Sequence, residues 1–281
     1  MDSRGASLKN KLVVIEPGRA DLDYWNDLWH FRELMFFLAW RDIVVRYKQT
    51  VIGVIWCLIR PMMTLIVFTI IFGKLAALPS GGVPYPILVF SGLLPWQFFS
   101  SALLDSSNSV VSNASMVSKV YFPRLIIPAS SIAVNLVDFM ISFLILIGLM
   151  LWYQVIPTWR MLILPLFIML LLATALGAGL LFASLNTKFR DFRYIVPFVV
   201  QFGLYVSPVG FSSDLVPEQW RLWYSLNPMV AVIDGFRWVI VGGEMRIYWP
   251  GFTASCFIIV LLFVIGIMHF RKTEKTFADM I

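Results

Sequence analysis

Six long apolar segments constrain the fold of this chain more than any other feature of its sequence. A helix needs about 20 mainly apolar residues to cross a bilayer, because the hydrocarbon core is about 30 Å thick and a helix rises about 1.5 Å per residue. With 59% hydrophobic and only 14% charged residues, the chain has more apolar surface than a soluble domain buries. We therefore predict an all-α integral membrane protein with six transmembrane helices, at about residues 51–74, 86–110, 125–152, 161–185, 194–211 and 250–270.

The positions of Lys and Arg predict how these spans are oriented. If the N-terminus lies in the cytoplasm, most of the 22 Lys and Arg residues fall in cytoplasmic segments, and six spans return the C-terminus to the same side. The net charge of +6 therefore reflects membrane topology, since no Arg-rich stripe with interleaved surface aromatics indicates nucleic-acid binding. The first 25 residues have no apolar region followed by a small-residue cleavage site, so we expect no cleaved signal peptide.

Two further segments are apolar in part but do not read as spans. Residues 26–49 are basic, rich in Trp and Phe, and partly segregated into polar and apolar faces, which predicts an amphipathic helix at the cytoplasmic membrane interface. Residues 212–249 are too polar to span, and Pro217, Asn227-Pro228 and Gly242-Gly243 divide them into short helices that we expect to be re-entrant from the outer leaflet. The predicted organisation is a polar N-terminal tail at 1–25, a transmembrane domain at 26–275 and a cytoplasmic tail at 276–281.

The sequence carries no signature of catalysis, nucleotide binding or metal binding. It has no G-x-x-x-x-G-K-[ST] phosphate loop, no G-x-S-x-G elbow and no H-E-x-x-H pair. Cys57 and Cys256 lie inside apolar runs, and His30 and His269 are isolated from other metal-ligating residues. We therefore predict no catalytic residue, cofactor or metal in this chain.

Two carboxylates fall within the predicted spans, where ionisable groups are costly and are candidates for function. Asp105 lies near the inner end of the second span, and Asp138 lies within the third, with Asn135 one turn before it and Ser142 one turn after. A transport path and a hydrogen bond between packed helices explain Asp138 equally well. For Asp105, a packing or interfacial role is the stronger explanation.

Two cytoplasmic connections have the composition of a docking surface. Residues 113–124, between the second and third spans, form a short helix pattern that ends at Pro123. Residues 186–193, between the fourth and fifth spans, alternate basic and aromatic side chains. Either segment alone suits a plain anchoring loop, but both together on one face suit mechanical coupling to another protein.

The order of these parts resembles the ABC-2 type export permeases for polysaccharides, such as O-antigen, capsule and teichoic acid. The resemblance covers about residues 26–275 and depends on a series of short motifs in order. They are Arg41-Asp-Ile-Val-Val-Arg46-Tyr-Lys-Gln49, Gly53-Val-Ile-Trp56 with Pro61, Ser91-Gly-Leu-Leu-Pro-Trp96 with Phe98 and Phe99, Lys119-Val-Tyr-Phe-Pro123, Asn186-Thr-Lys-Phe-Arg-Asp191 and Leu226-Asn-Pro228.

This resemblance implies a type V-like ABC exporter fold in the inner membrane, built as a homodimer with two copies of a separate cytoplasmic ATPase. The ATPase would bind ATP and Mg, and the substrate would be a glycan linked to a polyprenyl diphosphate. The family places ATPase coupling at residues 113–123, lipid access at the helix of residues 26–49 and an outer gate at residues 212–249. Expected coupling residues are Met116, Lys119, Tyr121, Phe122, Arg190 and Asp191, and expected gate residues are Trp220, Trp223, Asn227 and Pro228.

Two further sets follow from residue chemistry beside this resemblance. A cluster of cations suits a diphosphate, although the same charges also suit anionic lipid and fix topology. Aromatic faces stack on sugar rings, although an interfacial aromatic belt explains many aromatics here. We assign Arg41, Arg46, Lys48 and Arg60 to lipid diphosphate access, and Phe98, Phe99, Asp138 and Tyr205 to the polysaccharide path.

Three other functions remain open at this level. An ABC-2 exporter of a small drug or lipid would share the architecture. A membrane-embedded enzyme acting on a polyprenyl lipid would need clustered catalytic carboxylates near one surface, which the sequence does not show. A structural membrane subunit would not associate with an ATPase, so copurification separates it from an exporter.

Overall fold

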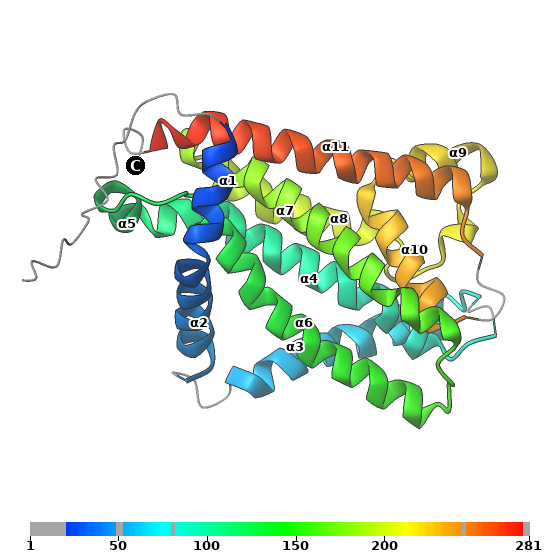
Figure 1. Cartoon of the computed structure of the whole chain (residues 1–281). Helices are drawn as coiled ribbons and strands as arrows, with labels where there is room; N and C mark the ends of the chain where they lie inside the picture. Colours follow the sequence, from blue (N-terminus) through cyan, green and yellow to red (C-terminus); the bar gives the residue numbers. More distant parts are fainter. Residues whose placement is uncertain (1–20, 49–52, 80–81, 243–245, 278–281) are drawn as a thin grey trace, which may run out of the picture.

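The computed structural model describes residues 21–48, 53–79, 82–242 and 246–277, and every regular element in those ranges is helical. Parts of the predicted tails and residues 51–52 of the first predicted span lie outside the described residues. The long helices lie side by side, α5 and the end of α11 lie at one end of the bundle, and α9 lies at the other (Figure 1). The elements are α1 Asp21–His30, α2 Arg32–Lys48, α3 Gly53–Phe68, π-helical η1 Thr69–Leu75, α4 Tyr85–Ser112, α5 Ala114–Lys119, α6 Ile126–Trp152, η2 Trp159–Ile163, α7 Leu164–Lys188, α8 Phe192–Val206, η3 Ser213–Leu215, α9 Glu218–Tyr224, α10 Pro228–Ile240 and α11 Trp249–Glu274.

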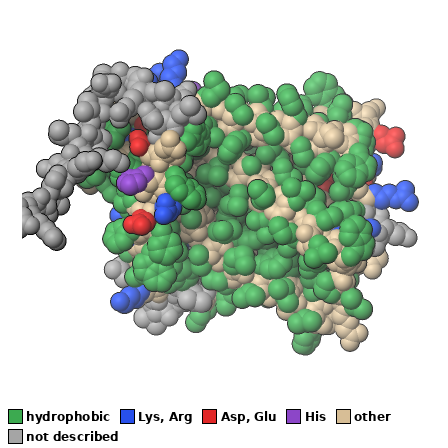
Figure 2. Space-filling model, viewed as in Figure 1, with side chains coloured by type: hydrophobic (Ala, Val, Ile, Leu, Met, Phe, Trp, Pro, Cys, Tyr) green, Lys and Arg blue, Asp and Glu red, His purple; other side chains and the backbone are tan. Residues whose placement is uncertain are grey.

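Within the described ranges, five helical segments are long and apolar enough to cross a membrane: Leu58–Leu75, Tyr85–Ser112, Ile126–Trp152, Trp159–Lys188 and Trp249–Glu274. They agree with five of the six predicted spans. The remaining helix, α8, has 15 residues and is about 22 Å long, which is shorter than the hydrocarbon core. Figure 2 shows hydrophobic side chains over the middle of the molecule and charged side chains towards its two ends, as a membrane protein requires.

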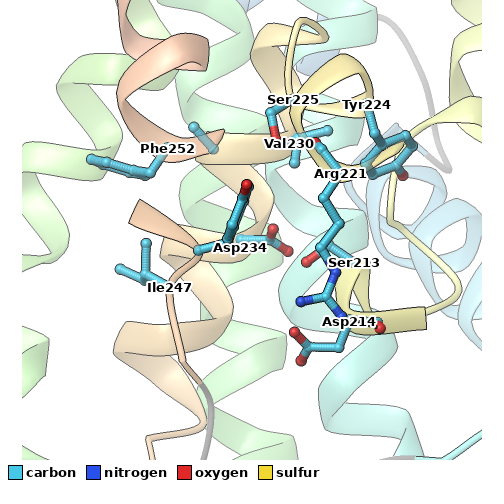
Figure 3. Close-up of a pocket in the computed structure, with 11 residues that line it drawn as sticks. Ser213, Asp214, Arg221, Tyr224, Ser225, Val230, Asp234, Ile247 and Phe252 are labelled. Carbon is cyan, nitrogen blue, oxygen red and sulfur yellow. Dashed lines mark hydrogen bonds between the residues drawn. The ribbon is translucent and has the colours of Figure 1, made fainter. Parts of the chain in front are cut away.

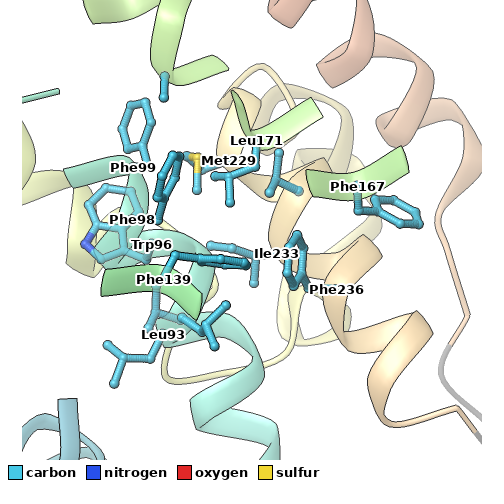
Figure 4. Close-up of a cluster of buried hydrophobic side chains, with 14 of the residues drawn as sticks. Leu93, Trp96, Phe98, Phe99, Phe139, Phe167, Leu171, Met229, Ile233 and Phe236 are labelled. Atoms are coloured by element: carbon cyan, nitrogen blue, oxygen red, sulfur yellow. The ribbon is translucent and has the colours of Figure 1, made fainter. Parts of the chain in front are cut away.

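Helix α4 lies at the centre of the bundle, where α6, α7, α8 and α10 all pack against it. The main buried cluster surrounds it with aromatic side chains from several helices (Figure 4). The ring of Phe139 on α6 packs edge-to-face against Phe98 and against Phe236. Because α4 is covered on most sides, its motif residues are core residues in this conformation.

Helices α7 and α11 approach closely because glycines face each other. A Cβ added at Gly177 would lie 2.7 Å from backbone atoms of Phe263, and one added at Gly266 would lie 2.2 Å from the Gly177 carbonyl oxygen. Small residues permit this approach between membrane helices, where van der Waals packing is a main source of stability. This contact packs the middle of α7 against the C-terminal half of α11.

The predicted amphipathic helix is two helices, α1 and α2, separated by a turn at Phe31. It begins at Asp21, so the boundary predicted at residue 26 is wrong by about one helical turn. Helix α2 lies across the end of the bundle and packs mainly on α6, burying Leu38 and Ala39 (Figure 1). Phe36, Phe37 and Trp40 on α2 are exposed, which suits contact with lipid headgroups.

Candidate functional site

A charged cluster joins α2 to the spans α4 and α6. The guanidinium of Arg46 donates from Nη1 to Asp138 Oδ2 at 2.6 Å and from Nη2 to Asp105 Oδ2 at 2.8 Å. The Asn135 amide bridges the same groups, accepting from Arg46 Nη1 at 3.3 Å and donating to Asp105 Oδ2 at 2.9 Å. The hydroxyl of Tyr47 donates to Asp138. We call Arg46, Tyr47, Asp105, Asn135 and Asp138 the inner charge cluster.

The inner charge cluster is partly accessible rather than sealed. The side chain of Arg46 keeps 34% of its surface exposed, and those of Asp105 and Asp138 keep similar fractions. Burial alone would lower the pKa of Arg46, but the hydrogen bonds and charges of Asp105 and Asp138 outweigh it and raise that pKa. The guanidinium therefore stays charged and ties three segments together by charge-assisted hydrogen bonds.

This cluster changes the meaning of two sequence-based assignments. The sequence assigns Arg46 to lipid diphosphate access and Asp138 to the polysaccharide path, and the structure brings the two side chains together. An incoming diphosphate would meet Arg46 beside two carboxylates. The contacts tie α2 to α4 and α6, so we call this attachment the latch of α2. They agree with the helix-packing explanation of Asp138, and both site assignments stay predictions.

The other predicted access residues lie outside this cluster. Arg41 forms an ion pair with Asp42 at 2.8 Å and donates to Asn113 Oδ1 at 3.4 Å, while Lys48 and Arg60 are exposed. Lys48 and Arg60 are therefore more accessible to a phosphate than Arg46 and Arg41, which both pair with carboxylates. Sequence alone does not distinguish them, because all four residues are basic and near one another along the chain.

The predicted coupling residues divide into exposed and buried members. Tyr121 is 61% exposed and Lys119 is exposed, whereas Phe122 is 3% exposed and packs in a second buried cluster with Leu38, Val117 and Phe270. Phe122 therefore packs beneath the exposed residues of this connection, and the coupling role of these residues stays a prediction. Met116 is half-buried against that cluster, and Arg190 and Asp191 are exposed at the turn before α8.

The residues predicted for the polysaccharide path also divide into buried and exposed members. Phe98 and Phe99 are buried in the core around α4, so they meet other side chains and no open path in this conformation. Tyr205 is exposed on α8 and shares that helix with other exposed rings. The hydropathy of a span does not reveal which of its faces is covered, so this division required the tertiary structure.

Residues 212–249, the predicted outer gate, contain α9 and α10, the two short helices that the helix breakers predict. The side chain of Asn227 caps α10 by accepting from the Met229 backbone N–H at 3.0 Å, and it donates to Ser207 Oγ at 2.9 Å. Pro228 occupies the first turn, where its missing N–H costs nothing. Trp220 and Trp223 on α9 are exposed.

Arg237 on α10 is a structural residue that the sequence did not single out. It is only 2% exposed and donates to the carbonyl oxygens of Leu88 at 3.2 Å, Phe211 at 2.6 Å and Val209 at 2.7 Å. The Tyr85 hydroxyl adds a bond of 2.5 Å to the Gly210 carbonyl. The carbonyls of Val209, Gly210 and Phe211 belong to non-helical backbone after α8, which is tolerated at membrane depth only when it is packed in protein, and the bond to Leu88 ties this segment to the first turn of α4.

A small pocket lies between α9, α10 and the start of α11 (Figure 3). Its polar lining includes Asp214, Arg221, Tyr224 and Asp234. Burial raises the pKa of the Asp234 carboxyl to about 6, although the charge of Arg237 opposes that shift. Among the described residues, no group of three or more His, Cys, Asp or Glu side chains is arranged to hold a metal ion.

The sequence that forms this helical bundle matches the model of a known protein family. A family model described as ABC-2 type transporter matches residues 33–241, which is most of the chain. The chain belongs to the ABC-2 type transporter family. Like the other members, this ABC-2 protein is a transport subunit and a multi-pass membrane protein.

This ABC-2 chain is similar to several characterised permeases over nearly their whole length. It is 25% identical over 260 residues to the O-antigen export system permease protein RfbA of Klebsiella pneumoniae, covering 91% of this chain and 97% of the relative. It is 24% identical over 259 residues to RfbA of Myxococcus xanthus, with coverage of 91% and 98%. It is 23% identical over 247 residues to the polysialic acid transport protein KpsM of Escherichia coli, with coverage of 84% and 91%.

Proposed function

We propose that this ABC-2 protein is the permease subunit of an ATP-driven exporter that moves a polyprenyl-diphosphate-linked polysaccharide, such as O-antigen or capsule, across the inner membrane. It works as a homodimer with two copies of a separate cytoplasmic ATPase, which binds ATP and Mg. Both chain termini lie in the cytoplasm. The relatives support a polysaccharide over a small drug, because they include O-antigen export and polysialic acid transport proteins.

The observation that carries the substrate class is an aromatic stripe along α8. Tyr194, Phe198, Phe202 and Tyr205 are all exposed, at spacings of three or four residues that place them on one helix face. The rings of Phe198 and Phe202 stack with centroids 6.1 Å apart. A stripe from one end of a short helix to the other offers repeated, weak contacts to successive sugar rings, as a polymer path requires.

The matched pair Phe198→Ala and Phe257→Ala tests this assignment. Both side chains are 67% exposed, but Phe257 lies on α11, away from the stripe. We expect Phe198→Ala to reduce export and to cause lipid-linked polymer to accumulate in the cytoplasm, because a sugar contact is lost. Phe257→Ala should export normally. Equal export by the two variants would show that α8 faces lipid and not the polymer.

The coupling surface proposed at Tyr121 and Lys119 needs a different test. Tyr121→Asp changes an exposed side chain, so the spans should insert and the protein should fold. It should weaken association with the ATPase and abolish export. Ile156→Asp introduces the same charge at an exposed apolar site in the connection after α6, at the opposite end of that helix from α5, and should leave association unchanged.

The role of the exposed cations in diphosphate access is tested by Arg60→Glu. We expect assembled transporter, normal ATPase binding and accumulation of lipid-linked polymer. Arg46→Glu is a poor test of access, because it would place a third carboxylate beside Asp105 and Asp138. Normal export by Arg60→Glu would leave Arg60 with a topological role only.

A further inference from the structure

Three segments that are distant in sequence meet at Glu274, the last residue of α11. Its Oε2 accepts from the Tyr24 hydroxyl of α1 at 2.9 Å, and its Oε1 accepts from the Arg124 backbone N–H at 2.6 Å. The Arg124 guanidinium returns a bond of 2.5 Å to the Glu274 carbonyl oxygen. The guanidinium of Arg271 lies 4.5 Å from the centroid of the Tyr24 ring. We call these four residues the clamp.

The clamp bonds are specific rather than incidental surface contacts. Tyr24 and Glu274 are half-buried, and burial together with the neighbouring carboxylate raises the pKa of Tyr24, so its hydroxyl stays protonated and donates. Hydrogen bonds to an ionised carboxylate are roughly twice as strong as neutral ones. The stacked guanidinium adds a cation–π contact to the same ring.

The clamp lies between two parts of the chain to which the proposed function assigns roles in transport. Arg124 ends the connection that contains α5 and Tyr121, and Tyr24 belongs to α1, which leads into α2 and its latch at Arg46. The buried cluster beneath the clamp joins the same parts, because Phe122 packs there with Leu38 of α2 and with Phe270 of α11. A displacement of residues 113–124 can therefore reach α2 through the hydrogen bonds of the clamp and through the buried apolar cluster.

We propose that Glu274 is a positioning residue that transmits movement of the ATPase-docking connection to the interface helices α1 and α2. This inference rests on the proposed function in that an ATPase docks at residues 113–123. Glu274 touches neither substrate nor nucleotide in this role. The Glu274 carboxylate is hydrogen-bonded to both Arg124 and Tyr24, so α1 moves with residues 120–124 when the docked ATPase displaces them. The movement of α1 then displaces α2, which is held by the inner charge cluster.

The variant Glu274→Ala, studied as the complete transporter with its ATPase, tests the proposal. We expect the complex to assemble and to hydrolyse ATP, while polymer exported per ATP hydrolysed falls at least tenfold. Glu274→Gln should restore most of this ratio, because an amide can accept from Arg124 and donate to the Tyr24 hydroxyl. Lys275→Ala, at the exposed neighbouring position, is the matched control and should leave the ratio unchanged.

Hydrogen exchange gives a readout that a merely structural role would not alter. In the wild-type complex, adding a non-hydrolysable ATP analogue should change amide exchange in residues 24–48, and Glu274→Ala should remove that change while exchange in residues 113–119 still responds. If Glu274→Ala does not fold, Tyr24→Phe removes only one hydroxyl and should give the same loss in weaker form. A wild-type ratio and response in both variants would overturn the proposal. A wild-type chain that binds no ATPase would instead overturn the proposed function.

Discussion

Arg46 and Arg237 are the same type of residue, but they differ in burial and in the groups that they bind. Arg237 is 2% exposed and binds three neutral backbone carbonyls, whereas Arg46 is a third exposed and binds two carboxylates. Because Arg237 is almost fully buried, its bonds are shielded from solvent. The bonds of Arg46 remain accessible to water and to other anions. Arg237 therefore stabilises the packed fold, whereas Arg46 holds α2 by bonds that solvent can reach.

The largest effect is expected from Arg237→Met. The substitution leaves the buried carbonyls of Val209 and Phe211 without this donor, while Leu88 keeps its bond from the Ser91 hydroxyl. We expect it to destabilise the protein by about 3–5 kcal/mol. Thermal unfolding in detergent measures the change. Arg221→Met is the control, because Arg221 binds only carbonyls a few residues away and its loss should cost less. Similar losses for both variants would contradict the distinction.

A smaller effect on stability is expected at the inner charge cluster. Arg46→Met should cost about 1–2 kcal/mol, because bonds to charged groups are strong but solvent screens a cluster that is a third exposed. A double-mutant cycle with Asp138→Asn should give a coupling energy of about 1 kcal/mol. Export should fall strongly even though most of the protein stays folded, since these bonds position α2. A coupling energy near zero would show that the two side chains do not stabilise each other.

Stability should also depend on pH through Asp234, which lies one turn before Arg237. Its pKa rises from 3.8 to about 6 on folding, so the folded state holds the proton to higher pH than the unfolded state. The contribution of Asp234 to the free energy of unfolding is therefore greatest below pH 3.8. It falls as the pH rises to about 6 and stays constant above that pH. Unfolding measured across this range should show the fall in the wild type and in the control Asp214→Asn, but not in Asp234→Asn.

The smallest effect is expected at Arg41, whose side chain is 42% exposed in its ion pair with Asp42. Exposed ion pairs contribute little, so Arg41→Ala should change the free energy of unfolding by less than about 0.5 kcal/mol. Together with Arg237 and Arg46, this variant orders three arginines by exposure. A cost at Arg41 as large as that at Arg46 would show that exposure does not decide the strength of these contacts.

The sequence by itself determined the helical class, most of the spans and the family. Hydropathy over 20 residues is a local property, and helix breakers such as Pro217 and the Asn227 cap act within a few residues. The same local signals predicted α9 and α10 and the short connection at α5. They failed where a boundary depended on packing, as at the start of α1 and at the short α8.

Only the tertiary structure decided which polar and aromatic side chains meet. Arg46 and Asp138 are 92 residues apart, and Tyr24 and Glu274 are 250 apart, so no periodicity within one helix links them. Likewise, Tyr121 and Phe122 are neighbours with similar chemistry, yet one is exposed and the other fills the cluster beneath α5. Burial depends on which other helix covers a residue, and that is a property of the packed bundle rather than of any one segment.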